Sequence, residues 1–404
     1  MIVSCFSKNS NSFEAGKELG SKIEGCEYVL LFAHYTYNFK DLIRGITSRT
    51  KCKITGCSSA EVISNGRIIE RGAAALGISS RDLVIGSAAH NIQDGYKAGR
   101  AVARNALEDL SEKENRDKLI NVFARYSAIV SNVPERLPLS KPYFYLFAFM
   151  DPFYMTDEKV IGGIRSKIQY SSPLLGGSAY GDYFNKSNYQ ILNNTVYDKS
   201  VVLNVIATNK SFGFGSESAF TPTSRKPYLV TRADDRIVYE MNYKSALDLY
   251  SEMCGKSKEE LIKEEAIGLS TGAEFPFMMV DNKGKPWMKY PAIANSDGSI
   301  TFGNRTPTGS VLFSAESTKE SVLKSAEKSI KTAIGQVKNP QVIIIFDCWH
   351  RRFILKDDIM EEEKVIKECV KDIPTIGFYT MGEYLPLCNL CHVTGSITTV
   401  VLGD

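Results

Sequence analysis

The sequence lacks any hydrophobic run long enough to cross a membrane. Its longest apolar runs, Tyr143–Met150 and Val342–Phe346, fall far short of the ~20 residues that a membrane-spanning helix needs. The amino-terminal segment has no charged stretch leading into an apolar one, so no secretory signal is visible. We therefore expect a cytoplasmic protein without membrane insertion.

The sequence also has little excess charge and little cysteine. Its 49 Lys and Arg residues nearly balance its 46 Asp and Glu residues, which leaves a formal net charge of +3 over 404 residues. Such a balance argues against bulk electrostatic binding of nucleic acid. Nine cysteines are too few for a disulfide scaffold, and their odd number fits reduced thiols in the cytoplasm.

Recognisable catalytic and nucleotide-binding motifs are missing. The sequence contains neither a GxSxG nor an HExxH motif. The Gly213–Ser218 segment has serine where a dinucleotide-binding loop needs its third glycine, and Tyr250 replaces the first glycine of a phosphate loop ending at Gly255–Ser257. Enzymatic activity is therefore not favoured. A thiol enzyme is the alternative, because partners such as Cys57 and His34 could meet in space.

One order of elements occurs three times along the chain: helix, strand, helix, glycine turn, strand. The helices have apolar residues at helical spacing, and the strands are short apolar runs. The blocks are, first, Ser12–Ile23, Tyr28–Ala33, Phe39–Thr47, Lys53–Ala60 and Ala73–Ile78; second, Gly95–Leu110, Tyr143–Met150, Thr156–Ile168, Pro173–Ala179 and Val201–Ala207; third, Thr318–Ile334, Gln341–Asp347, Lys356–Val370, Pro374–Gly377 and Ser396–Leu402. Apolar strands separated by helices favour sheets covered by helices, so we predict an α/β (α+β) fold.

We predict two modules, residues 1–235 and 236–404, each a β-sheet covered by helices. The stretch Ser211–Tyr228 is rich in Gly, Ser, Thr and Pro and indicates a linker or extended connection before the boundary. Beyond it, the pattern predicts several short strands. Ser257 followed by Glu260 predicts a capping box at the start of a helix.

The glycine turns give the three blocks their closest likeness. They read Thr55-Gly56-Cys57-Ser58, Leu175-Gly176-Gly177-Ser178 and Ile376-Gly377-Phe378-Tyr379. A glycine after a short strand lets the backbone approach something closely, either a neighbouring strand or a ligand. If it is a ligand, its contacts are expected at the following residues: Gly56, Ser58, Gly177, Ser178, Gly377 and Tyr379.

The constellation that we favour as a binding site is Cys348, Arg351 and Glu383. Cys348 and Arg351 follow an apolar strand at its carboxyl end, where ligands tend to lie in open α/β sheets. Arginine can hold a carboxylate in a bidentate fork, and glutamate can accept an ammonium group. An amino acid presents both groups. The alternative is that Arg351 and Glu383 pair with each other as a structural bridge.

The segment Cys388-Asn389-Leu390-Cys391-His392 matches the CxxCH string of haem attachment. Covalent attachment normally requires export of the chain. Non-covalent haem held by His392 does not have this requirement. Cys348, His350, Cys388, Cys391 and His392 could in principle form a zinc site, but their spacing is not that of a usual zinc knuckle. We expect no metal and no resident cofactor, with haem at His392 as the alternative.

These motifs and the order of elements resemble the FIST family, with its amino-terminal and carboxy-terminal modules. In the first module the likeness lies in Thr55–Ser59, Ala73–Ile78 and Pro173–Ser178. In the second it lies in the following: Arg236–Glu240, Ala246–Tyr250, Asp297–Ile300, Phe346–Arg351, Pro374–Glu383 and His392. The resemblance covers nearly the whole chain, and its most specific part is the Gly377–Glu383 string.

The resemblance implies a sensory protein that binds a small ligand. Amino acids are a proposed ligand class for the family, and a subset resembles haem-based nitric oxide sensors. FIST modules are often joined to output domains, for which this chain leaves no residues. We therefore expect signalling in trans to a partner such as a kinase or a chemoreceptor. A pocket between the two modules is the default place for the ligand.

Overall fold

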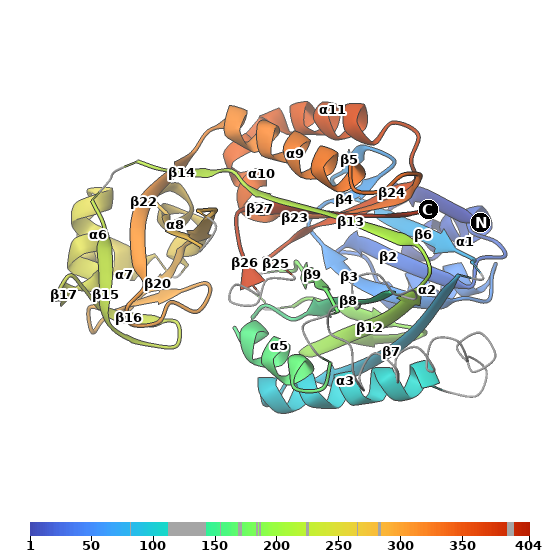
Figure 1. Cartoon of the computed structure of the whole chain (residues 1–404), viewed down its shortest axis with the longest axis horizontal. Helices are drawn as coiled ribbons and strands as arrows, with labels where there is room; N and C mark the ends of the chain where they lie inside the picture. The colour runs from blue at the N-terminus through green and yellow to red at the C-terminus, as the bar shows by residue number, and fades with distance from the viewer. Residues whose placement is uncertain are drawn as a thin grey trace.

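The computed structural model shows a large lobe and a small lobe, which Figure 1 displays on the right and on the left. The small lobe is an insertion, residues 220–317, between two elements of the large lobe. The residues that the structure describes are 1–80, 82–111, 143–153, 155–168, 172–182, 185, 187–223, 226–264, 266–281, 284–385 and 392–404. Among them, no helix is both long and apolar enough to cross a membrane.

The large lobe repeats one unit three times, as the sequence pattern predicts. Each unit is a pair of parallel strands joined by a crossover of one or two helices, as expected for a βαβ connection. The three units are β2 (Tyr28–His34), α2 (Phe39–Thr47) and β3 (Lys53–Ser59); β8 (Tyr143–Met150), α5 (Asp157–Arg165) and β9 (Leu174–Ser178); and β23 (Pro340–Cys348), α10 (Trp349–Leu355), α11 (Ile359–Val370) and β24 (Thr375–Thr380). The α/β fold is therefore confirmed.

Each parallel pair lies at the centre of a six-stranded sheet, and the three sheets have the same plan. Two further strands, which pair antiparallel, lie one after the other beside the first strand of each pair. These are β6 (Ala73–Ile78) and β1 (Ile2–Ser7); β12 (Ser200–Thr208) and β7 (Leu83–Asn91); and β27 (Ser396–Gly403) and β13 (Ser211–Ser218). One more helix covers each sheet and packs against the crossover helix of that sheet. These helices are α1 (Ser12–Lys22), α3 (Gly95–Ser111) and α9 (Lys319–Ile334).

A short hairpin completes each sheet, and each hairpin comes from a different unit. Hairpin β10–β11 (Gln190–Leu192, Thr195–Tyr197) follows the second unit but pairs with β3 of the first. Hairpin β25–β26 (Glu383–Tyr384, His392–Val393) follows the third but pairs with β9 of the second. Hairpin β4–β5 (Val62–Ser64, Arg67–Ile69) follows the first but pairs with β24 of the third. The exchange is cyclic and interlocks the three units.

The expected boundary at residue 235 lies in the turn between two strands of the small lobe, β15 (Tyr228–Asp234) and β16 (Ile237–Met241). Sheets of the large lobe take strands from both sides of that residue. Part of the expected linker, Ser211–Ser218, is strand β13. Its two glycines are needed because a Cβ at Gly213 or Gly215 would lie 2.0 Å from a carbonyl oxygen of α9.

The three turn glycines lie against a neighbouring strand. Gly56, Gly176 and Gly377 occupy the same place in their units, opposite Leu31, Ala148 and Ile345 of the preceding parallel strand. A Cβ at these glycines would lie 1.7, 2.0 and 2.5 Å from the carbonyl oxygens of those partners. The next residue of each first strand is a phenylalanine: Phe32, Phe149 and Phe346. These rings, together with Phe378, pack into the core between the sheets.

The small lobe is an antiparallel sheet with its own hydrophobic core. Its other elements are β14 (Phe220–Pro222), β17 (Lys244–Ser245), α6 (Ala246–Cys254), α7 (Lys258–Lys263), α8 (Thr271–Glu274), β18 (Phe277–Val280), β19 (Pro286–Lys289), β20 (Pro291–Ala294), β21 (Ile300–Phe302) and β22 (Val311–Ser317). The predicted capping box of Ser257 and Glu260 is present. Strands β14 and β22 pair with each other and connect the lobe to the rest of the chain.

Candidate functional site

A cavity of about 190 Å³ lies between the two lobes. This volume is far above the ~10–15 Å³ that a single water molecule needs. Its wall combines the carboxyl ends of β8 and β23, the start of α5, the residues around β26, and the face of the small lobe turned toward them. The lining residues are Pro152, Phe153, Met155, Asp157, Arg236, Gly268, Leu269, Tyr290, Ala292, Ile293, Gly303, Trp349, His350, Met381 and His392.

One end of the cavity carries a cluster of charged groups that joins the lobes. Arg236 of the small lobe is only 5% exposed and donates hydrogen bonds to the Gly303 carbonyl and to the Glu158 carboxylate on α5. Its Nη2 atom lies 3.6 Å from Oδ2 of Asp157. The backbone N–H of Arg305 donates to Glu158 across the same boundary at 2.9 Å. Two acidic side chains of α5 thus hold the small lobe.

The charges of this cluster nearly cancel. Burial by itself would raise the pKa of Glu158, but contact with His392 and the charge of Arg236 outweigh it and lower that pKa. Glu158 therefore stays ionised. Burial lowers the pKa of Lys289 to about 8, so its ammonium, which donates to the Arg305 carbonyl at 2.7 Å, is mostly protonated at neutral pH. Two carboxylates face a guanidinium and an ammonium, which suits a ligand with little net charge.

Among the described residues, the hydrogen bonds that position Asp157 reach only one of its carboxylate oxygens. Its Oδ1 accepts from the Ser178 hydroxyl at 3.0 Å and from the Tyr384 hydroxyl at 2.8 Å. The Ser178 and Tyr384 oxygens are themselves 2.7 Å apart. The other oxygen, Oδ2, is the one that faces Arg236. Ser178 is therefore one hydrogen bond away from the cavity wall.

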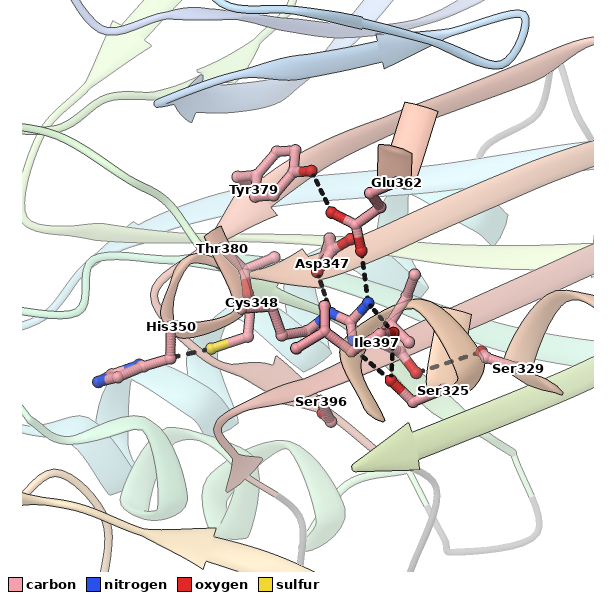
Figure 2. Close-up of polar contacts among 12 residues, drawn as sticks. Ser325, Ser329, Asp347, Cys348, His350, Glu362, Tyr379, Thr380, Ser396 and Ile397 are labelled. Carbon is pink, nitrogen blue, oxygen red and sulfur yellow. Dashed lines mark hydrogen bonds and ion pairs between the residues drawn. The ribbon is translucent and has the colours of Figure 1, made fainter. Parts of the chain in front are cut away.

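The other part of the cavity is built from rings. The Tyr290 and His350 rings have centroids 4.5 Å apart, and the His350 and Trp349 centroids are 6.2 Å apart. Figure 2 shows His350 beside Cys348, whose Sγ lies 3.7 Å from Nδ1. The Nε2 atom of His350 is buried without a hydrogen-bond partner among the described residues. Burial lowers the pKa of His350 to about 4, so this wall presents a neutral imidazole.

His392 lines the cavity but does not fit the role of an iron ligand in this arrangement. Its Nδ1 lies 3.8 Å from the Glu158 carboxylate. Its Nε2 is packed so closely against Gly382 that a Cβ there would be 2.2 Å away. Neither ring nitrogen has a hydrogen-bond partner among the described residues, but an axial haem ligand needs a ring nitrogen with open space in front of it, and Glu158 and Gly382 crowd these two. The cysteines of the CxxCH string, Cys388 and Cys391, lie outside the described residues.

Arg351 lies in the protein interior. It is fully buried, and it donates to Asp347, Ser325, the Val322 carbonyl and Glu362. Figure 2 shows that Glu362 is also reached by Tyr379, whose hydroxyl donates to it at 2.8 Å. Arg351 thus forms ion pairs with Asp347 and Glu362. Its hydrogen-bonding capacity is used within the protein, which leaves little for a ligand.

Glu383 and Cys348 are also fully buried. The Glu383 carboxyl accepts hydrogen bonds from Thr380 and Ser396, and burial raises its pKa to about 7. Burial raises the pKa of the Cys348 thiol well above its ordinary value. The structure therefore brings Cys348, Arg351 and Glu383 to one region but buries them in the core. His350 contacts Cys348 and also lines the cavity, so it links the two.

Most candidate residues of the repeated turns make contacts within the protein. Gly56 and Gly377 face neighbouring strands, and Gly177 faces the Thr380 side chain. The Ser58 hydroxyl donates to the Tyr180 carbonyl at 2.6 Å and accepts from the Tyr189 N–H at 2.9 Å. Tyr379 is bound to Glu362, as described above. Of the six, Ser178 comes nearest to the cavity.

The seven cysteines that the structure describes show no sign of nucleophilic activation. Burial raises the pKa of every cysteine that the structure describes. Over the same residues, no group of His, Cys, Asp and Glu side chains is arranged to hold a metal ion. His34, the suggested partner of Cys57, has its Nδ1 atom 2.7 Å from the Thr36 hydroxyl.

The fold and the cavity define an α/β protein with a polar and aromatic cavity between a threefold-repeated lobe and an inserted lobe. Family models identify it further: residues 27–244 match the FIST N domain and residues 246–386 match the FIST C domain. The chain therefore belongs to the FIST family, whose domains are associated with small-ligand sensing in signalling proteins.

Other comparisons add little. No curated protein gave a significant match. Among solved structures, the chain is similar to T. maritima PurL complexed with ADP, with 10% identity and a TM-score of 0.19 over 100% of this chain and 71% of that one. PurL complexed with AMPPCP gives 10% identity and a TM-score of 0.20, over 100% and 72%. Likeness at this level carries no argument about fold or function.

Sequence reasoning missed three residues that shape the cavity: Asp157, Arg236 and Tyr290. Asp157 lies at the start of the predicted helix Thr156–Ile168, where acidic residues are favoured, so it did not suggest a binding site. Arg236 stood within a family motif, in a turn between two short strands. An arginine in such a turn usually faces solvent, so nothing local distinguished it. The expected ligand site used Arg351 and Glu383, whereas the arginine and the carboxylate that line the cavity are Arg236 and Asp157.

Proposed function

We propose that this protein binds a small zwitterionic ligand of the amino-acid class in the cavity between its lobes. The observation that carries the proposal is the pair Asp157 and Arg236. They belong to different lobes, line the same cavity, and carry opposite charges within a nearly neutral cluster. A ligand with one positive and one negative group matches such a pair without leaving a buried charge uncompensated.

The two charged groups have complementary capacity left for a ligand. Oδ2 of Asp157 lies 3.6 Å from Arg236, which is longer than a hydrogen bond. This oxygen can therefore accept a hydrogen bond from the ammonium group of a ligand in the cavity. The guanidinium of Arg236 has more N–H donors than its two hydrogen bonds to Gly303 and Glu158 use. These donors suit a ligand carboxylate.

A ligand in this position would contact both lobes and so stabilise one orientation of the small lobe. A signalling partner such as a kinase or a chemoreceptor would then recognise that orientation in trans. We place this activity in the cytoplasm, where the free cysteines among the described residues would stay reduced.

The test is a thermal-shift screen of the purified chain against single amino acids. A ligand at 100 times its Kd stabilises the folded state by about 2.7 kcal/mol, which is readily seen as a rise in Tm. Asp157→Asn keeps the shape of the side chain and should abolish the shift. Asp372→Asn changes an exposed carboxylate elsewhere and should keep it. A shift that persists in Asp157→Asn would place the ligand at another site.

A further inference from the structure

We infer that the ligand carries a planar aromatic group, held by the ring-lined part of the cavity. This inference rests on the proposed function, since it concerns the same cavity. Five of the fifteen lining residues have flat rings: Phe153, Tyr290, Trp349, His350 and His392. Because ligand rings pack well against rings at offset or edge-to-face angles, such a wall selects for shape as well as for apolar character.

The rings come from both lobes, and their planes are tilted relative to one another. Tyr290 belongs to the small lobe, whereas Phe153, Trp349 and His350 belong to the large one. The Tyr290 and His350 planes are tilted by 50°, and the Trp349 and His350 planes by 73°. A planar group that packs against these rings from the cavity would meet ring faces and ring edges at once.

Two glycines fix the orientation of the Tyr290 ring. A Cβ at Gly303 would lie 2.0 Å from Cζ of Tyr290, and one at Gly268 would lie 3.0 Å from Cε2. The ring therefore lies directly on the backbone at Gly303 and is packed on a second side by Gly268. Both glycines also line the cavity. A wall held in this way is organised before the ligand arrives, which reduces the entropy lost on binding.

The rest of the lining argues against a charged ligand side chain. The lining residues with a full charge are Asp157 and Arg236, which the ligand's ammonium and carboxylate groups would engage. The remaining wall has the rings together with Leu269, Ile293 and Met381, and the His350 ring is neutral. Apart from His392, which lies beside Glu158, no other described lining residue has a side chain that would neutralise an additional acid or base on the ligand.

The chain offers a direct probe of this wall because it contains two tryptophans. Trp349 lines the cavity, whereas Trp287 is 1% exposed and donates to Asp281 at 3.0 Å. In a Trp287→Phe variant, tryptophan emission reports on Trp349 alone. Titration with phenylalanine, which does not absorb at 295 nm, should change this emission in a saturable way. We expect phenylalanine to bind at least about tenfold more tightly than leucine.

A second variant and a second readout keep the test independent of the folding of Trp287→Phe. Thermal shifts of the unmodified chain with phenylalanine and leucine should show the same preference. Trp349→Leu should reduce the preference for phenylalanine while leaving leucine binding within about threefold, because an aliphatic ligand loses little when a ring wall becomes aliphatic.

The outcomes separate this inference from the proposed function. Binding of leucine or alanine with no gain for phenylalanine would overturn the aromatic inference and leave the proposed function standing. Binding of phenylalanine together with equal binding of phenylpropionate would support the aromatic wall and contradict the zwitterion. No shift and no saturable emission change with any of these compounds would overturn both.

Discussion

Arg351, on α10, is held by a buried network whose other members lie on four elements. Its partners are Asp347 at the end of β23, Ser325 on α9 and Glu362 on α11, and Tyr379 on β24 continues the network through Glu362. A buried network of one arginine and two carboxylates is costly to desolvate. Removing one member of the network costs far more, because the remaining charges are then uncompensated.

We predict that Arg351→Met destabilises the protein by about 3–5 kcal/mol. Urea unfolding followed by circular dichroism measures the change. Arg352→Met is the neighbouring control and should lose clearly less, because its partner Glu61 has a pKa raised to about 7 by burial and can take up a proton. An Arg351 variant as stable as the parent would show that the network contributes little.

Glu383 makes stability depend on pH in the opposite sense to a surface carboxylate. Burial raises its pKa to about 7 from an ordinary value of 4.5, so the folded state binds this proton more tightly than the unfolded state. Its stabilising contribution is complete below pH 4.5 and is lost as the pH rises through 7.

We predict that Glu383→Gln removes this loss. Between pH 5 and pH 8 the free energy of unfolding should fall less in the variant than in the parent, and the variant should be relatively more stable at pH 8. Parallel denaturant titrations at the two pH values measure the difference. Identical pH dependence in both proteins would mean that Glu383 has an ordinary pKa.

At the scale of elements, each parallel strand pair needs a glycine at one position. Gly176 has φ of +127°, a conformation that favours glycine, and a Cβ there would meet the Ala148 carbonyl oxygen at 2.0 Å. The strand pair could accommodate alanine only by moving apart, which would disturb the hydrogen bonds of the sheet.

We predict that Gly176→Ala destabilises the protein by about 1–3 kcal/mol or more. Gly162→Ala is the matched control. Among the described residues, a Cβ there meets only the Tyr96 ring, at 3.8 Å, and alanine is favoured over glycine within a helix by about 1 kcal/mol. Thermal melts of both variants should move in opposite directions. Equal behaviour would mean that the strands of the second unit adjust without cost.

The repeated elements could be predicted because their signals are local. Phe39–Thr47 is a helix with the predicted bounds, and the three glycine turns occupy equivalent places. The exchange of hairpins could not be predicted, since nothing in Gln190–Leu192 specifies β3 as its partner. For Arg351 the acids at positions 347 and 362 were visible, but the depth at which α9 and α11 bury them depends on the assembled lobe.

At the scale of the whole molecule, the small lobe is joined to the large one by two adjacent strands. Phe220 of β14 is opposite Ser317 of β22, and the Ala219 carbonyl accepts hydrogen bonds from the hydroxyls of Ser317 and Ser321. The two ends of the inserted lobe are therefore close together. Its main core lies within the lobe, and Trp287 packs against Leu385 and Val393 of the large lobe.

We predict that residues 220–317 can be replaced by a short glycine linker without unfolding the large lobe. The shortened chain should keep its circular dichroism signature and a cooperative melt. Its Tm should be lower, because Leu385 and Val393 lose their contact with Trp287. It should also lose any ligand-induced shift, because Arg236 is removed. A non-cooperative melt would show that the large lobe depends on the insertion for its fold.

The position of β27 has a consequence for synthesis on the ribosome. This strand, Ser396–Gly403, is completely buried between β13 and β23, yet it is made last of the three. At about 5–20 residues per second, the nascent chain waits roughly ten to forty seconds between β13 and its partner. During that interval β13 exposes an unpaired edge, which is a template for aggregation. The protein should therefore depend on chaperones during translation more than its final compactness suggests.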